Sequence, residues 1–346
     1  MPEHLMIEAA YGRPHERIPA WIMRQAGRYI PQYQDIKTEY SFADICASPK
    51  LMAEVSMHPV HILGVDAAII FSDILFPLKP MGLDLAFTGK GPAIANPIRT
   101  GEDVKRLHTC NPEKDLSLVL QGIQELRKQL EEKIPLIGFA GSPFTLACYA
   151  IEGRGSTDGD TAKTFLREHR DAAHTMLGLL AEVIGAYLKS QIAAGAQLVQ
   201  VFDSRGSILT TDEYEEFSLP YIQRVCEICQ TPGVPRIVFS TDTSPFLELL
   251  ANLDCEVVSI DWGTDIERAF EILEGKTIQG NLNPKIMLGT ADEIRKELSV
   301  LLEKVGGRDN YIFNLGHGIP PQTPVVNARL VIETVQNYTR TTTYDR

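Results

Sequence analysis

Two arginines, Arg24 and Arg28, stand four residues apart directly after a short apolar run. In a helix, that spacing would place both guanidinium groups on one face. Gly27 between them costs a helix roughly 1 kcal/mol relative to alanine, and Pro31 limits any helix that follows. We therefore predict a strand end that opens into a loop carrying two cations. A guanidinium suits carboxylate or phosphate groups, so the pair predicts an anion site, with an exposed basic turn as the alternative.

Asp73 is a carboxylate at the end of a second apolar run. A charge at the mouth of a buried strand is costly unless it has a partner. As a functional group it would bind N–H donors or stabilise a developing cation. At 4 Å and an effective dielectric constant of ~20, one such charge contributes about 4 kcal/mol before desolvation. That is roughly a thousandfold in rate if the charge is felt only in the transition state. The alternative is an aspartate that caps the next helix.

Three further candidates follow other strand-like runs. His317 lies between Gly316 and Gly318, and flanking glycines let backbone or ligand approach closely. Tyr149 and Ser204 each carry a hydroxyl group, for which a structural role is the alternative. The position of all three after apolar runs predicts that they can reach the same site as the arginines.

The elements that must position these residues alternate along the chain. Most of the runs of strand length are continuously apolar, which suits strands buried on both faces. These runs are 18–23, 66–72, 134–140, 197–203, 236–240, 257–261, 277–280 and 311–314. Between them lie stretches that can form helices, of which the clearest are 117–132, 160–194, 213–230 and 291–305.

This alternation predicts an α/β fold, a (β/α)8 barrel of the TIM type, and a single domain over residues 1–346. The carboxyl ends of the strands in such a barrel meet at one face, where the active sites of this fold lie. Independent surface turns would not explain why arginines, a carboxylate, two hydroxyls and a histidine all follow strand ends. We therefore predict a functional cleft at that face.

The composition is that of an ordinary soluble globular protein, with 44% hydrophobic and 23% charged residues in 346. We find no apolar stretch of the ~20 residues that span a bilayer, and no signal-peptide core in residues 1–17. We expect a cytoplasmic protein without a membrane partner. A net charge of −12 and the lack of a Lys/Arg tract argue against nucleic acid. A local arginine cluster can still bind an acidic ligand, because salt at 0.1 M screens exposed charges beyond about 10 Å.

No pattern predicts a metal or a nucleotide cofactor. Of the six cysteines, only Cys226 and Cys229 have redox or metal spacing. One isolated pair in a helical-looking stretch favours buried structural thiols. His58 and His61 have no cysteine nearby, and no HExxH pattern occurs, which argues against zinc. Neither GxGxxG nor a Walker-type loop occurs, so we expect no cofactor.

Five motifs, in order along nearly the whole chain, resemble the uroporphyrinogen decarboxylase family. They are Met-Arg-Gln-Ala-Gly-Arg-Tyr at 23–29, Ile-Ile-Phe-Ser-Asp-Ile-Leu at 69–75, Gly-Ser-Pro-Phe-Thr-Leu at 141–146, Gly-Asn-Leu-Asn-Pro at 280–284 and Asn-Leu-Gly-His-Gly-Ile at 314–319. The resemblance implies a (β/α)8 barrel that works as a homodimer without cofactor or metal. It implies a small-molecule substrate, uroporphyrinogen III, whose four acetate side chains lose CO2 to give coproporphyrinogen III for haem synthesis.

The resemblance also implies roles for individual residues. Arg24 and Arg28 match the family's arginines for substrate carboxylates, and Asp73 matches the aspartate that binds the pyrrole N–H groups. The other matching contacts are Tyr149, Ser204, His317, the apolar Phe42, and the loop residues Gln25, Ala26 and Gly27.

This chemistry agrees with the residue types. The substrate carries eight carboxylates for the arginines and four pyrrole N–H groups for one carboxylate. Decarboxylation beside a pyrrole needs an electron sink, which protonation of the ring carbon creates as a cation, and Asp73 would stabilise that cation. The proton source stays open. Arg24 is a catalytic candidate by position, although a group with a pKa above ~12 is a poor general acid; solvent and a substrate carboxyl are alternatives.

Three segments depart from the family pattern. Arg205 stands where the family commonly has an aromatic residue, and Asn283 stands where an aspartate is usual. Ser240-Thr241-Asp242 replaces a segment that commonly contains glycine or lysine. Of these, Arg205 could add or redirect a contact with a carboxylate.

Two other functions stay open. A zinc-dependent methyltransferase for corrinoid or thiol substrates, from the same barrel superfamily, would need a His/Cys ligand set that we do not find. A metal assay separates that alternative. A non-catalytic tetrapyrrole-binding protein would keep Arg24 and Arg28 but would not need Asp73, and turnover of uroporphyrinogen separates it.

Overall fold

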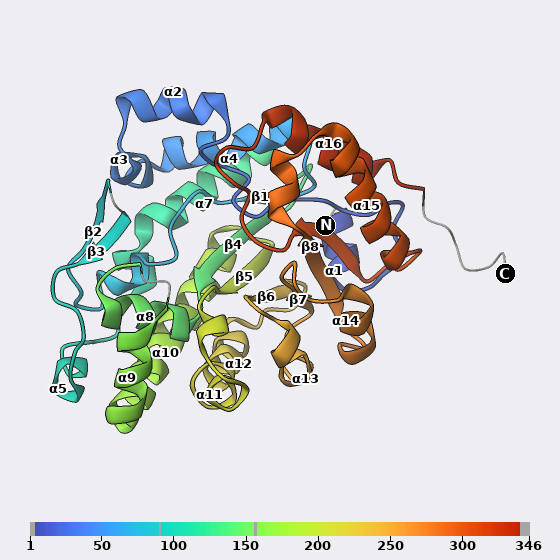
Figure 1. Cartoon of the computed structure of the whole chain (residues 1–346). Helices are drawn as coiled ribbons and strands as arrows, with labels where there is room; N and C mark the ends of the chain where they lie inside the picture. The colour runs from blue at the N-terminus through green and yellow to red at the C-terminus, as the bar shows by residue number, and fades with distance from the viewer. Residues whose placement is uncertain (1–3, 90, 156–157, 340–346) are drawn as a thin grey trace.

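The central feature of the fold is one curled sheet of seven parallel strands, surrounded by helices (Figure 1). The structure is a computed structural model that describes residues 4–89, 91–155 and 158–339. The strand order is β1-β4-β5-β6-β7-β8-β9, and every neighbouring pair is parallel. The strands are β1 (Ala68–Ile69), β4 (Leu136–Gly141), β5 (Leu198–Asp203), β6 (Arg236–Ser240), β7 (Val257–Ser259), β8 (Thr277–Leu282) and β9 (Tyr311–Leu315). They are buried along almost their whole length, as expected for a parallel sheet covered on both faces.

The first predicted strand, residues 18–23, is wrong as a strand and forms only one parallel bridge, between Ala20 and Phe313. Side chains take several of the backbone N–H groups that a ladder would use. The Ala20 N–H donates to the carboxylate of Asp66 at 2.8 Å, and the Met23 N–H donates to Oδ1 of Asn314 at 2.8 Å. The segment still lies between β9 and β1, because the Asp66 N–H donates to the Ala20 carbonyl at 2.9 Å. The structure therefore shows seven of the eight strands expected for a barrel of the TIM type.

Helices connect the strands and cover the outside of the sheet (Figure 1). They are α1 (Leu5–Ala10), α2 (Pro31–Glu39), α3 (Phe42–Cys46), α4 (Pro49–Leu63), α5 (Gly101–Val104), α6 (Pro112–Asp115), α7 (Ser117–Leu130), α8 (Pro143–Glu152), α9 (Asp160–Glu168), α10 (Arg170–Ala194), α11 (Thr211–Phe217), α12 (Leu219–Cys229), α13 (Leu247–Leu250), α14 (Ile266–Ile272), α15 (Ala291–Val305) and α16 (Val325–Gln336). Short 3-10 turns are η1 (Phe76–Leu78), η2 (Gly206–Ile208), η3 (Ser244–Phe246) and η4 (Pro284–Leu288).

Two of the predicted helices are interrupted. The stretch 160–194 forms α9 and α10, which meet at the non-helical residue His169. The stretch 213–230 forms α11 and α12, which meet at Ser218. Pro220 lacks an N–H group and cannot continue the ladder of α11, and the Ser218 hydroxyl bonds to the buried Asp203 at 2.8 Å. The prediction for 291–305 is confirmed by α15.

A two-stranded antiparallel hairpin, β2 (Leu85–Thr88) and β3 (Gly91–Ile94), was not predicted. Each of its strands has only four residues, and Pro92 lowers the strand signal of the second. The hairpin lies beside α3, and Figure 1 shows it at the edge of the molecule. It matters for function because Pro92 and Phe87 stand at or next to the cavity described below.

Helix α10 has the length and apolar composition of a membrane span, contrary to the expectation that no stretch did. Charged side chains such as Glu182 and Lys189 interrupt its apolar pattern. Of its most apolar window, 56% is buried inside the structure, where it packs against α8, α12 and β4. These contacts are those of a core helix.

Candidate active site

A cavity of about 570 Å³ opens at the carboxyl ends of the strands. Segments after β1, β4, β5 and β9 line it, together with the loop after Met23 and with α2. The predicted site residues that line it are Arg24, Ala26, Gly27, Arg28, Phe42, Asp73, Tyr149, Ser204 and His317. The structure therefore brings together nine of the ten predicted residues, from segments almost 300 positions apart.

The loop that carries Arg24 is held in an unusual backbone conformation. Arg24 has φ +64°, in the left-handed region that non-glycine residues seldom adopt. The Met23 carbonyl accepts the Ile319 N–H at 2.9 Å, which ties this loop to the one that carries His317. A Cβ atom at Gly318 would lie 2.4 Å from Cδ of Arg24. Gly318 therefore allows the arginine side chain to pass against the backbone of the second loop.

Gln25 differs from the other residues of its motif, because it does not line the cavity. Its side chain is 0% exposed. Its oxygen accepts the Ile22 N–H at 3.0 Å, and its nitrogen donates to the Ala67 carbonyl at 2.9 Å. The side chain of Gln25 thus fastens the arginine loop to β1 and is directed away from the site.

Asp73 is the one carboxylate among the described residues that line the cavity. Its Oδ1 atom accepts the Leu75 N–H at 2.9 Å, and no helix begins on it: η1 starts at Phe76 with Leu75 in the capping position. Burial raises the pKa of Asp73, while the Leu75 N–H and the charge of Arg24 oppose that rise. The carboxylate is therefore held at the end of a buried strand with one oxygen bonded locally, as an Asx turn and not as a helix cap.

Three cations line the same cavity, and one of them was missed by the sequence analysis. Arg24, Arg28 and Lys37 all contribute to the wall. Within the described residues, none of the three forms an ion pair. Lys37 lies in the last turn of α2. A single lysine nine positions after Arg28 in a short polar helix gives no sequence signal, because its direction depends on how α2 packs.

His317 is a neutral imidazole at pH 7. Burial, and then the charge of Arg24, lower its pKa to about 4, although Asp261 opposes the shift. Its ring lies edge-on to Phe239 and Trp262, with ring centroids 6.2 and 6.3 Å away. A neutral ring can accept or donate one hydrogen bond to a ligand, but at neutral pH it holds no proton to transfer as an acid.

The remaining contacts supply hydroxyl groups and an aromatic wall. Tyr149 lies on α8 and Ser204 lies in the loop after β5. Phe42 begins α3, and its ring packs edge-on against Phe71 and Phe87 at 5.7 and 5.0 Å between centroids. The cavity thus combines cations on its rim with an apolar interior, a combination that suits a flat ligand with acidic side chains.

The three departures from the family pattern lie outside this cavity. Arg205 does not line it; its guanidinium lies over the ring of Tyr149, 5.4 Å from the centroid. Asn283 caps η4 through the Lys285 N–H at 3.0 Å. Asp242 lines a separate depression, together with Asp261.

No group of three or more His, Cys, Asp or Glu side chains that could hold a metal ion occurs in the part of the chain that the structure describes. The cysteines of the Cys226/Cys229 pair are buried and free. Burial raises the pKa of Cys229 to about 11, as expected for an unreactive thiol.

A model of the uroporphyrinogen decarboxylase family (URO-D) matches residues 1–338. Uroporphyrinogen decarboxylase of Syntrophotalea carbinolica is 43% identical over 342 residues, 98% of this chain and 99% of that protein. The enzyme of the same name from Carboxydothermus hydrogenoformans is 45% identical over 319 residues, 92% of this chain and 91% of that protein.

Solved structures with a similar fold include a methyltransferase from Methanosarcina mazei. Its TM-score is 0.81 at 17% identity, and the alignment covers 95% of this chain and 96% of that one. A B12-independent methionine synthase from Shewanella sp. W3-18-1 has a TM-score of 0.59 at 13% identity, over 92% of this chain and 95% of that one. At these identities the likeness concerns the fold alone.

Proposed function

The chain belongs to the uroporphyrinogen decarboxylase family, and we propose that its cavity removes CO2 from the four acetate side chains of uroporphyrinogen III. One observation carries this proposal: a single carboxylate, Asp73, faces a cavity whose cations form no ion pair among the described residues. The substrate supplies the complement, with eight carboxylates around its edge and four N–H groups at its centre. The product is coproporphyrinogen III.

Arg24 and Arg28 bind carboxylates of the substrate in this proposal. A guanidinium holds a carboxylate through two parallel N–H bonds, which fixes orientation as well as charge. Lys37 adds a third positive charge at the rim. Because none of these groups has an ion-pair partner in the described residues, no internal ion pair must break when the substrate binds.

Asp73 binds the pyrrole N–H groups and stabilises the cation that forms during reaction. Protonation of the ring carbon gives a positively charged ring that accepts the electron pair of the breaking C–C bond as CO2 departs. The exocyclic methylene group that remains takes up a proton to become the methyl group, and the ring carbon loses its added proton, so that one proton is consumed for each CO2 released. The raised pKa of Asp73 reflects a carboxylate short of partners. Bound N–H donors and a developing cation would supply those partners and favour the ionised form.

The proton that reaches the ring carbon has three candidate sources: the Arg24 guanidinium, a water molecule and a carboxyl group of the substrate. The low pKa of His317 makes it a poor acid at neutral pH. We assign His317, Tyr149 and Ser204 to neutral hydrogen bonds with the substrate, and Phe42 to an apolar contact. Ala26 and Gly27 present loop backbone to the cavity, while Gln25 supports that loop from behind.

The direct experiment is an anaerobic assay with chemically reduced uroporphyrinogen III and purified protein. Products that have lost one to four carboxyl groups are separated by chromatography, in the presence and in the absence of a chelator. The proposal expects stepwise loss of carboxyl groups to coproporphyrinogen, unchanged by the chelator. Binding of the porphyrinogen without any loss of CO2 would support the tetrapyrrole-binding alternative.

The proposal also covers the closure of the barrel and the number of domains. We propose the segment 18–23 as the eighth element that closes the barrel, because it bonds to β9 on one side and to Asp66, two residues before β1, on the other. We treat residues 1–346 as one domain, supported by a family match that spans 1–338.

A homodimer in the cytoplasm is proposed from the family alone. Sedimentation at micromolar concentration tests it, and a monomer would contradict it.

A further inference from the structure

Two hydroxyl groups of the cavity wall come from separate elements. Tyr149 lies in α8, whereas Ser204 lies in the loop that follows β5. Along the strand, Phe202 and Ser204 both line the cavity, and Asp203 between them is directed away, as the two-residue period of a strand requires. Asp203 is 0% exposed, and it is this buried carboxylate that joins the two elements.

Among the described residues, three hydroxyl groups donate hydrogen bonds to the Asp203 carboxylate. Its Oδ1 atom accepts from the hydroxyls of Ser142 at 2.6 Å and Thr145 at 3.0 Å, both at the start of α8. Its Oδ2 atom accepts from the hydroxyl of Ser218 at 2.8 Å. Burial raises the pKa of Asp203, and these hydrogen bonds oppose the rise.

Thr145 differs from the other two hydroxyls, because it also holds the loop. Its Oγ1 atom accepts the backbone N–H of Arg205 at 3.2 Å while donating to Asp203. Thr145 therefore bonds to the residue before Ser204 and to the residue after it. The backbone of Ser204 is fixed on both sides by one hydroxyl group.

A second contact acts on Tyr149. Thr145 and Tyr149 are four residues apart in α8 and thus lie on the same face of the helix. The guanidinium of Arg205 lies over the Tyr149 ring, 5.4 Å from its centroid, within the range of a cation–π contact. Within the described residues, Arg205 forms no ion pair that would draw it elsewhere.

We propose that Thr145 and Arg205 are positioning residues that set the distance and direction between the hydroxyls of Tyr149 and Ser204. This inference rests on the proposed function, because those hydroxyls matter only if they contact the substrate. Thr145 acts through the Asp203 carboxylate and the Arg205 N–H, and Arg205 acts through the ring of Tyr149. Neither residue touches the substrate.

Three variants of the hydroxyls that bond to Asp203 distinguish a positioning role from a role in stability alone. Thr145→Val keeps the shape and removes the hydroxyl, so we expect KM to rise by about 5- to 20-fold with a smaller change in kcat. Thr145→Ser restores the hydroxyl and should restore KM. Ser218→Ala is the matched control, because it removes a similar bond to Asp203 from the junction of α11 and α12, which does not line the cavity, and it should leave KM within about twofold.

A double-mutant cycle shows whether Thr145 acts through Ser204. In a Ser204→Ala background, Thr145→Val should raise KM by clearly less than it does alone, because the hydroxyl whose backbone Thr145 fixes is absent. A full additional increase in KM would overturn the proposal, as would equal kinetic effects of Thr145→Val and Ser218→Ala. If Thr145→Val does not fold, Arg205→Ala tests the proposal instead. This variant leaves the hydrogen bonds of Asp203 intact and should raise KM by about 3- to 10-fold. An unchanged KM in Arg205→Ala would overturn the proposal.

Turnover by the wild-type protein tests the proposed function separately from the positioning role. Loss of CO2 from uroporphyrinogen III by the wild-type protein is required before the variants are compared. Wild-type protein without any such turnover contradicts the proposed function, whereas normal wild-type turnover with an unchanged KM in the variants contradicts the positioning role alone.

Discussion

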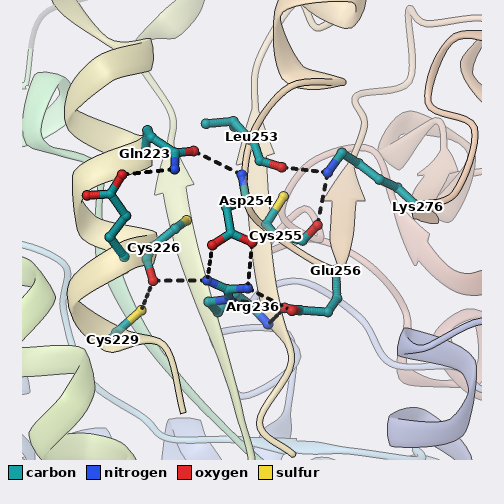
Figure 2. A network of polar contacts seen from close by, with 10 residues as sticks. Gln223, Cys226, Cys229, Arg236, Leu253, Asp254, Cys255, Glu256 and Lys276 are labelled. Carbon is teal, nitrogen blue, oxygen red and sulfur yellow. Dashed lines mark hydrogen bonds and ion pairs between the residues drawn. The ribbon is translucent and has the colours of Figure 1, made fainter. Parts of the chain in front are cut away.

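The two ends of the sheet use arginine in opposite ways. At the amino end of β6, Arg236 is 3% exposed and bonds to Asp254 and Glu256 at 3.0 and 2.8 Å, and to the Cys226 carbonyl at 3.1 Å (Figure 2). Burial alone would lower the pKa of Arg236, but its bonds with the two carboxylates raise it. At the carboxyl ends, Arg24 and Arg28 are exposed to the cavity and form no ion pair in the described residues.

The difference shows which charges belong to the fold and which are available to a ligand. At the amino end a second arginine is also paired internally: Arg17 holds Asp66 through two bonds, at 2.8 and 2.6 Å. A buried charge without a partner is expensive, so these carboxylates remove a cost that the two arginines would otherwise carry. The unpaired charges at the other end remain in contact with solvent until a polyanion displaces the water. Four predictions test this contrast.

Asp73→Asn carries the largest expected effect. Asparagine keeps the size and one acceptor oxygen but loses the charge, so kcat should fall by about 100- to 1,000-fold while KM changes little. Asp265→Asn is the matched control, because Asp265 also accepts the N–H group two residues on, at 2.8 Å, at a helix start remote from the cavity. Near-normal kcat in Asp73→Asn would show that this carboxylate is only a local turn.

Arg236→Met should act on stability and not on turnover. It removes both ion pairs, and we expect the free energy of unfolding to fall by about 2–3 kcal/mol. This is less than the 3–5 kcal/mol typical of a broken buried pair, because Asp254 is 49% exposed and can be solvated. Urea unfolding measures the loss, and kcat/KM of the folded variant should stay within about twofold. A large fall in kcat/KM would contradict the division of roles.

Arg28→Ala should act on binding and not on stability. Losing one charge-assisted contact with the substrate costs about 1.5–3 kcal/mol, so KM should rise by roughly 10- to 100-fold. Arg224→Ala removes an exposed arginine that pairs with Glu182 and Glu227 on the surface, and it should leave KM unchanged. A collapsed kcat with normal KM in Arg28→Ala would assign this arginine to the chemical step.

The smallest effect concerns pH. Because the folded pKa of Asp73 is raised, its contribution to stability is present below its unfolded value near 3.8 and is lost as pH rises through the folded pKa. Asp73→Asn should therefore melt slightly above the wild type at pH 7, by about 1–3 °C, and this difference should shrink toward pH 4. A lower melting temperature at pH 7 would show that the carboxylate is paired within the protein.

The sequence predicted the order of elements and the face that holds the site, since apolar runs and the residues after them are local signals. The bounds of β6 and α15 agree with the prediction. It failed where a distant side chain replaced a backbone partner. Asp66 takes the Ala20 N–H, and Asn314 takes the Met23 N–H, so the segment 18–23 does not form a full strand.

In the candidate site, too, local sequence signals were predictive and contacts between distant residues were not. The predicted site residues line the cavity, with the exception of Gln25, whose side chain bonds to the Ala67 carbonyl; the motifs at 141–146 and 280–284 contribute no lining residue. Lys37 was missed because the packing of α2 determines where it lies. The role proposed for Thr145 could not be predicted from the sequence either, because its hydroxyl finds its partner only when the fold brings Asp203 of β5 beside α8.

The central claim is that Arg24 and Arg28, which form no ion pair in the described residues, bind the carboxylates of the porphyrinogen. The most direct measurement is the rise in melting temperature caused by coproporphyrinogen III under anaerobic conditions, since a ligand that binds the folded state stabilises it by an amount that grows with the logarithm of the ligand concentration over its dissociation constant. We predict a clear rise for the wild type, a similar rise for Arg236→Met from its lower starting point, and little or none for the Arg24→Ala/Arg28→Ala double variant. An equal rise in the double variant would contradict the claim.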